Sequence, residues 1–339
     1  MKHLLLISPD NHSIYADLIT ELQKMGIKAD FLPDRDLNYD PDNVRAPFHT
    51  PRFIFSLMSR LYWKRLLSKP EYNKKYDYLL TIDGEALNSV VFEILRKRNP
   101  KVYCVNYLYD TISGVYRFDR YFHFYDKVFS FDNKECNIYK MNLLPIFWVP
   151  IQEQEIKYCF FAFGGYNENR YIVYNQVKQY TDSIGKESYI GLFIRKIKHE
   201  KLYILKRAIR RLLKMPVYLS IERYHDSLIT TKELLPEDFR RLISSSDIIV
   251  DTHPTYQSGL TARFMWALGA RKKIVTTNKD VINYPFYSKE QIFILPESLQ
   301  LDNEFVNFIK APMRLSKDIE ESIDKFRVDN WLRVVLSLE

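Results

Sequence analysis

The chain has 339 residues, more than a typical single-core domain, so we expect two domains. Hydrophobic residues make up 46% and charged residues 27% of the sequence, which is a globular composition and excludes a chain that is disordered as a whole. The formal net charge of +8 favours an anionic partner, and nucleic acid, a phosphorylated substrate and an acidic membrane surface all qualify.

The cysteines and the N-terminus indicate the compartment. Cys104, Cys136 and Cys159 match no metal-ligand spacing and are too few for a disulfide framework, which favours the reducing cytoplasm. The first apolar run ends at Pro9, so we interpret it as a strand and not as a signal peptide. No uninterrupted apolar stretch reaches about 18 residues, so we expect no membrane-spanning helix.

The first half of the chain alternates apolar runs typical of strands with amphipathic stretches typical of helices. Gly26 and the pair Asn99-Pro100 stand where helices commonly end. The predicted strands are residues 4–8, 28–32, 78–82, 101–107 and 127–131, and the predicted helices are residues 14–25 and 87–98. This alternation predicts a parallel sheet with helices on both faces.

A domain boundary is expected within residues 145–155, where two prolines precede a charged run. The predicted strands beyond it are residues 158–163, 189–195 and 217–221, and the predicted helices are residues 169–184, 200–214, 236–244 and 316–327. We therefore expect one domain over residues 1–153, a second over residues 154–315, and a C-terminal helix over residues 316–339 that returns to the first domain. The expected architecture is α/β, with two Rossmann-like lobes facing a cleft.

The most informative segment is SDIIVDTHPTYQSGLTARFMWALGARKKIVTTN, residues 246–278. It reads as a buried strand, a polar loop, a helix that begins near Thr261 and a second buried strand. The first N–H groups of a helix lack intrahelical partners and lie at the positive end of its dipole, so such a turn binds anions. The turn contains Ser258, Gly259, Leu260 and Thr261, and Arg263 follows it. We interpret it as a diphosphate cradle, although an ordinary turn eased by Gly259 remains an alternative.

Three stretches of the chain resemble the GT-B-fold glycosyltransferases of bacterial envelope-polysaccharide and lipopolysaccharide core biosynthesis, a group that includes spore-maturation-like transferases. The stretches are YDKVFSFDNKECNIYKMNLLPIFWVP (residues 125–150), FFAFGGYNENRY (residues 160–171) and QSGLTARFMWALGARKKIVTTN (residues 257–278). The resemblance implies that the C-terminal lobe holds a nucleotide-sugar donor and that the N-terminal lobe holds the acceptor.

Two places in the second lobe are expected to hold the donor. Gly164 and Gly165 end a predicted strand, at the edge where ligands of open α/β sheets bind. Arg170 has a fork of donors that suits phosphate oxygens, although an ordinary turn with a surface arginine is the alternative. The expected donor-binding residues are Gly164, Gly165, Arg170, Gln257, Ser258, Gly259, Leu260, Thr261 and Arg263.

Asp110 and His12 are the candidate catalytic residues. Both follow predicted strands of the first lobe, and a base there would take the proton of an acceptor hydroxyl. Asp10, Asp83 and Glu85 are further acidic residues at such strand ends. The triplet Asp34-Arg35-Asp36 matches a pattern of metal-dependent transferases, but it lies in an acidic loop of the first lobe and we interpret it as a solvated loop. We therefore expect a metal-independent enzyme without a cofactor.

Trp266 departs from the resemblance. Transferases of this group commonly carry a glutamate there that accepts hydrogen bonds from the ribose hydroxyls, whereas an indole offers one donor and no acceptor. We interpret Trp266 as a core residue; packing against the donor's ribose or base, or the loss of donor binding, are the alternatives.

The segment from Arg52 to Lys69 combines aromatic, aliphatic and basic residues. On a helix, Phe53, Leu57, Leu61 and Trp63 would share one broad face. This pattern is typical either of an interfacial helix on an anionic membrane or of a core helix with a solvated basic face. No nucleic-acid-binding motif is evident, so we expect no nucleic-acid partner.

The sequence and the resemblance together predict a cytoplasmic glycosyltransferase, peripheral at the inner face of the membrane. It would move a sugar from a nucleotide-sugar to an envelope glycan or a lipid-linked acceptor. Two alternatives remain: a non-catalytic relative that acts as a binding or scaffold protein in glycan assembly, and a pyruvyl or phospho-group transferase on the same fold.

Overall fold

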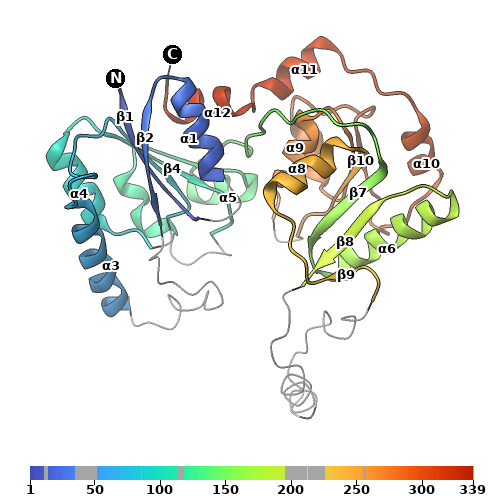
Figure 1. Cartoon of the computed structure of the whole chain (residues 1–339), viewed down its shortest axis with the longest axis horizontal. Helices are drawn as coiled ribbons and strands as arrows, with labels where there is room; N and C mark the ends of the chain where they lie inside the picture. Colours follow the sequence, from blue (N-terminus) through green and yellow to red (C-terminus); the bar gives the residue numbers. More distant parts are fainter. Residues whose placement is uncertain are drawn as a thin grey trace. The chain divides into compact units, whose positions relative to one another are not determined.

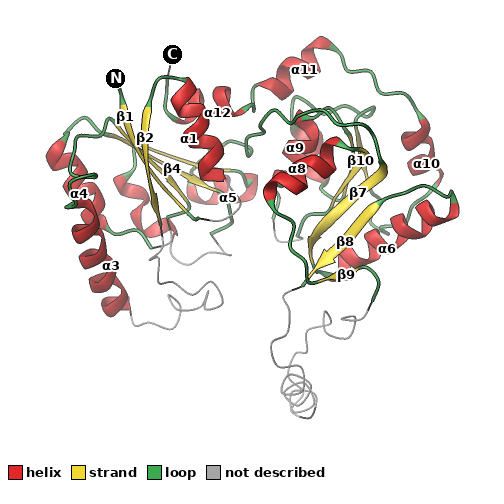
Figure 2. Ribbon diagram, in the orientation of Figure 1, coloured by secondary structure: helices red, strands yellow, loops and turns green. Residues whose placement is uncertain are grey.

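A computed structural model of the chain describes residues 1–10, 14–34, 52–84, 86–112, 118–194, 212, 226–254 and 257–338. The chain divides into two compact units, each with its own six-stranded sheet (Figures 1 and 2). The first unit comprises Met1–Val149, Thr255–Met265 and Ser322–Glu339, and the second comprises Pro150–Pro254 and Trp266–Glu321. The predicted α/β class is confirmed.

The first sheet has the strand order β2-β1-β3-β4-β5-β6, and all neighbouring strands are parallel. Its strands are β1 His3–Ser8, β2 Lys28–Pro33, β3 Tyr78–Ile82, β4 Tyr103–Leu108, β5 Lys127–Ser130 and β6 Asn142–Leu143. Every residue of β3 is buried, because a parallel sheet is covered on both faces. Because all the strands are parallel, their carboxyl ends meet at one edge of the sheet, which is where open α/β sheets bind ligands.

The helices of the first unit begin at polar capping residues or after loops. They are α1 Ile14–Lys24, α3 Arg52–Leu67, α4 Ser89–Arg98, the 3-10 helix η2 Phe118–Phe124, α5 Asn133–Tyr139 and α12 Val328–Val335. The Asn88 side chain accepts the N–H of Val90 and begins α4, and Asp132 accepts the N–H of Glu135 at 3.0 Å and begins α5. Gly26, with φ +74°, follows α1 as the sequence predicts.

The second sheet has the order β12-β11-β10-β7-β8-β9 and is also parallel throughout. Its strands are β7 Tyr158–Gly165, β8 Tyr189–Phe193, β9 Ile229–Thr230, β10 Ser246–Asp251, β11 Lys273–Thr276 and β12 Ile292–Ile294. The helices are α6 Glu168–Ser183, α8 Pro236–Ser244, α9 Ala262–Gly269, the 3-10 helix η4 Lys279–Asn283, α10 Asn303–Lys310 and α11 Lys317–Asp324. The first residues of α9 belong to the first unit and its remainder to the second.

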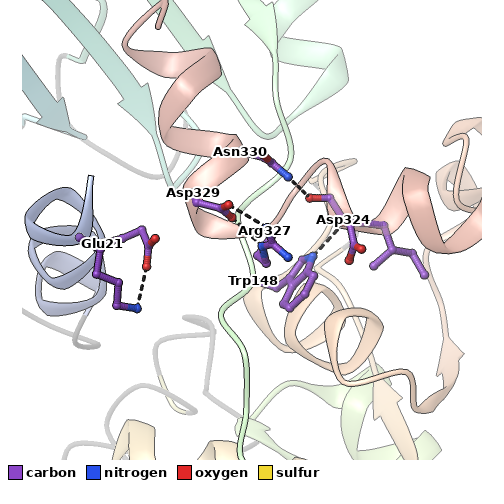
Figure 3. A network of polar contacts seen from close by, with 8 residues as sticks. Glu21, Trp148, Asp324, Arg327, Asp329 and Asn330 are labelled. Atoms are coloured by element: carbon purple, nitrogen blue, oxygen red, sulfur yellow. Dashed lines mark hydrogen bonds and ion pairs between the residues drawn. The ribbon is translucent and has the colours of Figure 1, made fainter. Parts of the chain in front are cut away.

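The C-terminal segment Ser322–Glu339 belongs to the first unit, and it pairs with Trp148, near the end of the stretch Met1–Val149 (Figure 3). The backbone N–H of Trp148 donates to Phe326 at 3.0 Å, and its carbonyl accepts from Val328 at 3.0 Å. The indole N–H of Trp148 donates to the carbonyl of Ile323 at 2.9 Å. The predicted return of a C-terminal helix to the first lobe is thereby confirmed.

The predicted helix over residues 316–327 is present as α11, but the segment 316–339 is not the single C-terminal helix that was predicted. The chain forms α11 and then α12, with Arg327 in an extended conformation between them (φ −63°, ψ 145°). The backbone pairing with Trp148 interrupts the helical hydrogen bonds at this point. The predicted helix over residues 200–214 and the strand over 217–221 lie outside the described residues, apart from Leu212. None of the described helices combines the length and the apolar character needed to cross a bilayer.

Candidate functional site

Acidic side chains follow four strands at the carboxyl edge of the first sheet, and three of these strands, β3, β4 and β5, are neighbours. Asp34 follows β2, Asp83 follows β3, Asp110 follows β4 and Asp132 follows β5. Asp34 is fully buried, which corrects its assignment to a solvated loop. The other two residues of the Asp34-Arg35-Asp36 triplet lie outside the described residues, as do the candidate base His12 and the nearby Glu85.

Asp83 is held in an uncommon backbone conformation by the end of the neighbouring strand. Its φ is +57°, and its Oδ1 accepts the N–H groups of Tyr109 at 2.7 Å and Asp110 at 3.3 Å. Burial, together with the charges of Asp34 and Asp110, raises the pKa of Asp83 to about 8 against the opposing effect of these hydrogen bonds. This carboxyl therefore exchanges its proton close to neutral pH, where acid–base catalysis operates.

Asp110, the first predicted catalytic residue, contacts one of the predicted donor residues. Its Oδ1 accepts the Nε2–H of Gln257 at 3.0 Å and the backbone N–H of Thr111 at 2.7 Å. Burial raises the pKa of the Asp110 carboxyl above its usual value, although both hydrogen bonds oppose the shift. A carboxylate with a raised pKa is a stronger base, so the position suits a proton acceptor.

The Ser258-Gly259 turn binds an anion in the structure, and that anion is the Asp132 carboxylate. Its Oδ2 accepts the backbone N–H groups of Ser258 at 2.6 Å and Gly259 at 3.1 Å, and its Oδ1 accepts the Ser258 hydroxyl at 2.9 Å. Burial raises the pKa of Asp132, but the hydrogen bonds from Ser258, Glu135 and Gly259 outweigh burial and hold it below its usual value. The diphosphate cradle thus stays a prediction with one condition: Asp132 has to release these two N–H groups.

Packing against Phe131 explains why position 259 is a glycine. A Cβ there would lie 2.2 Å from Cδ2 of the Phe131 ring and 2.7 Å from the Phe131 carbonyl oxygen. The next residue, Leu260, is buried, and the Thr261 hydroxyl accepts the N–H of Phe264 at 3.1 Å and caps α9. Arg263, within α9, is buried as well.

In the second unit, Arg170 ties the ends of two strands together. Its Nε–H donates to the Thr252 hydroxyl at 2.7 Å, its Nη2–H donates to the Thr252 carbonyl at 2.9 Å, and Nη1–H donates to the Gly165 carbonyl. A Cβ on Gly164 would lie 2.9 Å from Nη1 of Arg170, so glycine leaves the space for this guanidinium. Arg170 is buried, which corrects the surface-arginine alternative.

Trp266 is a buried residue, as the first of its three interpretations predicts. Its ring lies edge-on to Phe239 with centroids 5.9 Å apart, and the Arg240 guanidinium lies 4.9 Å from its centroid. Its indole N–H has no acceptor within the described part of the chain. At the ends of β10 and β11 in the second sheet, His253 Nδ1 lies 2.9 Å from the Thr277 hydroxyl. This contact anchors the loop after β10.

Sequence reasoning did not assign a role to Asp132. The spacing of Asp132 and Glu135 matches a capping pattern at the start of α5, and this local signal was available. Its bonds to Ser258 and Gly259 join residues more than one hundred positions apart, and no local pattern predicts them.

No family model matches the sequence, and no curated protein matches it. Among solved structures, the apo structure of OtsA matches with a TM-score of 0.53 and 12% sequence identity, covering 99% of this chain and 98% of its own. TarM of S. aureus, in complex with fondaparinux, α-GlcNAc-glycerol and UDP, matches with a TM-score of 0.50 and 10% identity, covering 100% of this chain and 99% of its own. The likeness to both structures shows that this chain has their α/β fold.

Proposed function

We propose that the chain is a glycosyltransferase that moves a sugar from a nucleotide-sugar donor to a cell-envelope glycan or a lipid-linked acceptor. The observation that carries the proposal is the Asp83–Asp110 pair, held at the carboxyl edge of the first sheet on a fold shared with OtsA and TarM. TarM was solved with UDP, a product of transfer from a nucleotide-sugar, and this supports the same class of donor here.

In the proposed reaction, the acceptor hydroxyl attacks the anomeric carbon while the bond from that carbon to the nucleoside diphosphate breaks. The hydroxyl proton passes to Asp110, whose raised pKa and fixed position suit a general base. Gln257 orients this carboxylate, and Asp83 holds the backbone N–H of Asp110. His12 remains a second candidate base.

The donor side of the proposal involves Gly164, Gly165, Arg170 and the turn from Gln257 to Arg263. The negative charge of the leaving diphosphate would be stabilised by N–H groups at helix starts and by arginine, without a metal ion. The described residues contain no cluster of three or more His, Cys, Asp or Glu side chains that could hold a metal. This role requires Asp132 to leave the Ser258-Gly259 turn.

A non-catalytic relative that binds glycans or partners is the second candidate. Two observations favour it: the Asp132 carboxylate already occupies the predicted phosphate turn, and Trp266 cannot accept hydrogen bonds from a ribose. Turnover of any donor would exclude this alternative.

The test is the release of nucleoside diphosphate from a panel of UDP-, GDP- and ADP-sugars and of CMP from CMP-sugars, with and without lipid-linked acceptors. We expect release from one donor, and we expect Asp110→Asn to slow it by about 10²- to 10⁴-fold while the donor still raises the melting temperature. Asp182→Asn, a change on the surface of α6, serves as the control. Normal turnover by Asp110→Asn would remove Asp110 as the base.

A further inference from the structure

The helix α3 is attached to the first unit through one face. Trp63 and Leu67 on this face are fully buried. The Ser59 hydroxyl and the Trp63 indole N–H both donate to the carbonyl of Ala86, at 2.8 Å and 2.9 Å. These bonds and the buried tryptophan fix the rotation of the helix about its own axis. The outward direction of the exposed side chains described on α3 follows from that rotation.

The opposite face of α3 is apolar and exposed. Its large hydrophobic side chains are between 38% and 74% exposed, and they are Phe53, Ile54, Leu57, Met58 and Leu61. With about 100° of rotation per residue, these five positions fall within one sector of about 140°. No other described helix exposes more than two large hydrophobic side chains. A contiguous apolar face of this kind marks an interaction surface.

The charged residues of α3 itself are all basic. The sixteen residues of α3 include no Asp and no Glu. Lys64 and Arg65, in its last turn, follow the apolar positions at the C-terminal end of the same sector, and Lys69 lies just beyond the helix; all three are exposed. Arg60 lies to one side, where it is paired with Glu93 at 3.2 Å. The surface therefore combines an apolar patch with unbalanced positive charge at one end.

We propose that this face of α3 docks on an anionic lipid bilayer. Phe53, Leu57 and Leu61 would enter the boundary between headgroups and acyl chains, while Lys64, Arg65 and Lys69 would contact lipid phosphates. A bilayer surface accommodates both halves of the face at once. A nucleic-acid backbone would not bury five large apolar side chains, and a purely apolar partner would not pair with the three cations. The proposal does not depend on sugar transfer, and its test uses no substrate.

The experiment is flotation of the full chain with phosphatidylcholine vesicles that contain or lack phosphatidylglycerol. We expect binding to the anionic vesicles, weaker binding to the neutral ones, and a loss of affinity as salt screens the cations. The double substitution Leu57→Ser and Leu61→Ser should lower the partition coefficient by about tenfold or more. Lys64→Gln with Arg65→Gln and Lys69→Gln should abolish the preference for anionic vesicles.

The matched control changes two similarly exposed hydrophobic side chains elsewhere, Ile138→Ser and Ile282→Ser, and should leave vesicle binding unchanged. All substituted positions are exposed, so circular dichroism should show the native fold in every variant. Equal binding by the α3 variants and the wild type would overturn the proposal. So would the absence of vesicle binding together with a dimer, seen by light scattering, that the Leu57 and Leu61 changes dissociate, because a second copy would then be the occupant.

Discussion

Phe131 determines which residue fits at position 259. Because a Cβ there would lie 2.2 Å from the Phe131 ring, any side chain at this position displaces a buried aromatic. Gly164 meets a comparable limit at Arg170, whereas a Cβ on Gly165 would meet nothing within 4 Å. The adjacent glycines Gly164 and Gly165, which the sequence does not distinguish, therefore differ in whether a side chain would fit.

We expect Gly259→Ala to lower the free energy of unfolding by about 1–3 kcal/mol, through overpacking against Phe131. Gly165→Ala is the matched control and should change stability by no more than about 0.5 kcal/mol, since the space is open. Urea unfolding of both variants measures the difference. Equal stabilities would show that Phe131 does not restrict position 259.

Asp83 makes the stability depend on pH. Its folded pKa of about 8 lies above the ordinary value of an aspartate, so the folded state binds a proton that the unfolded state releases. Asp83 therefore contributes stability at low pH that is lost as the pH rises toward 8. The slope is at most about 1.4 kcal/mol per pH unit.

The variant Asp83→Asn stays neutral and keeps an acceptor oxygen for Tyr109 and Asp110. We expect its stability relative to the wild type to increase steadily between pH 5 and pH 8, as followed by urea midpoints. A constant difference across this range would mean that Asp83 is already ionised in the folded protein near pH 5.

At the scale of elements, α12 holds the C-terminal segment on the first unit. Trp331 is fully buried, with ring centroids 4.8 Å from Tyr107 and 5.1 Å from Phe147, and its indole N–H donates to the Pro145 carbonyl at 3.1 Å. Trp331→Ala removes these contacts and should lower the free energy of unfolding by about 3–5 kcal/mol. Val334→Ala, on the exposed side of the same helix, should change it by less than about 0.5 kcal/mol. Thermal or urea unfolding that shows similar losses for both variants would contradict this role of α12.

The contact between α5 and the turn before α9 has a functional consequence if that turn holds a diphosphate. Asp132→Asn removes the charge that competes for the N–H groups of Ser258 and Gly259 but keeps one acceptor oxygen. We expect nucleoside diphosphates to bind about tenfold more tightly, by titration calorimetry. Asp302→Asn, which alters a similar cap on α10, is the control and should not change affinity. An unchanged affinity in Asp132→Asn would place the nucleotide away from this turn.

For the whole molecule, local patterns predicted most of the elements. The run YLLTI predicted β3 residue for residue, and Pro236 with the acidic residues that follow it predicted the start of α8. The break between α11 and α12 was missed, because it depends on the backbone of Trp148. The expected grouping of Trp63 with Phe53, Leu57 and Leu61 was wrong: at about 100° per residue Trp63 falls outside the sector of the other three, and it is buried whereas they are exposed. Periodicity identifies the residues on a helix face but not which face meets the protein.

The candidate site was predictable only in its local parts. Acidic residues at strand ends pointed to Asp110, and a glycine turn before a helix pointed to residues 257–263. That Asp110 meets Gln257 and that Asp132 fills the turn depend on how distant segments pack. The pKa of Asp83 likewise depends on burial and on neighbouring charges that a linear sequence does not show.

The most direct test of the central claim is a thermal-shift screen of the purified chain against UDP, GDP, CDP, ADP, CMP and their sugar conjugates. A ligand that binds only the folded state raises the melting temperature by mass action. The proposed function predicts a clear shift with one nucleotide and its sugar conjugate, and none with the others. The absence of a shift with every nucleotide would contradict a nucleotide-sugar donor and favour the non-catalytic relative.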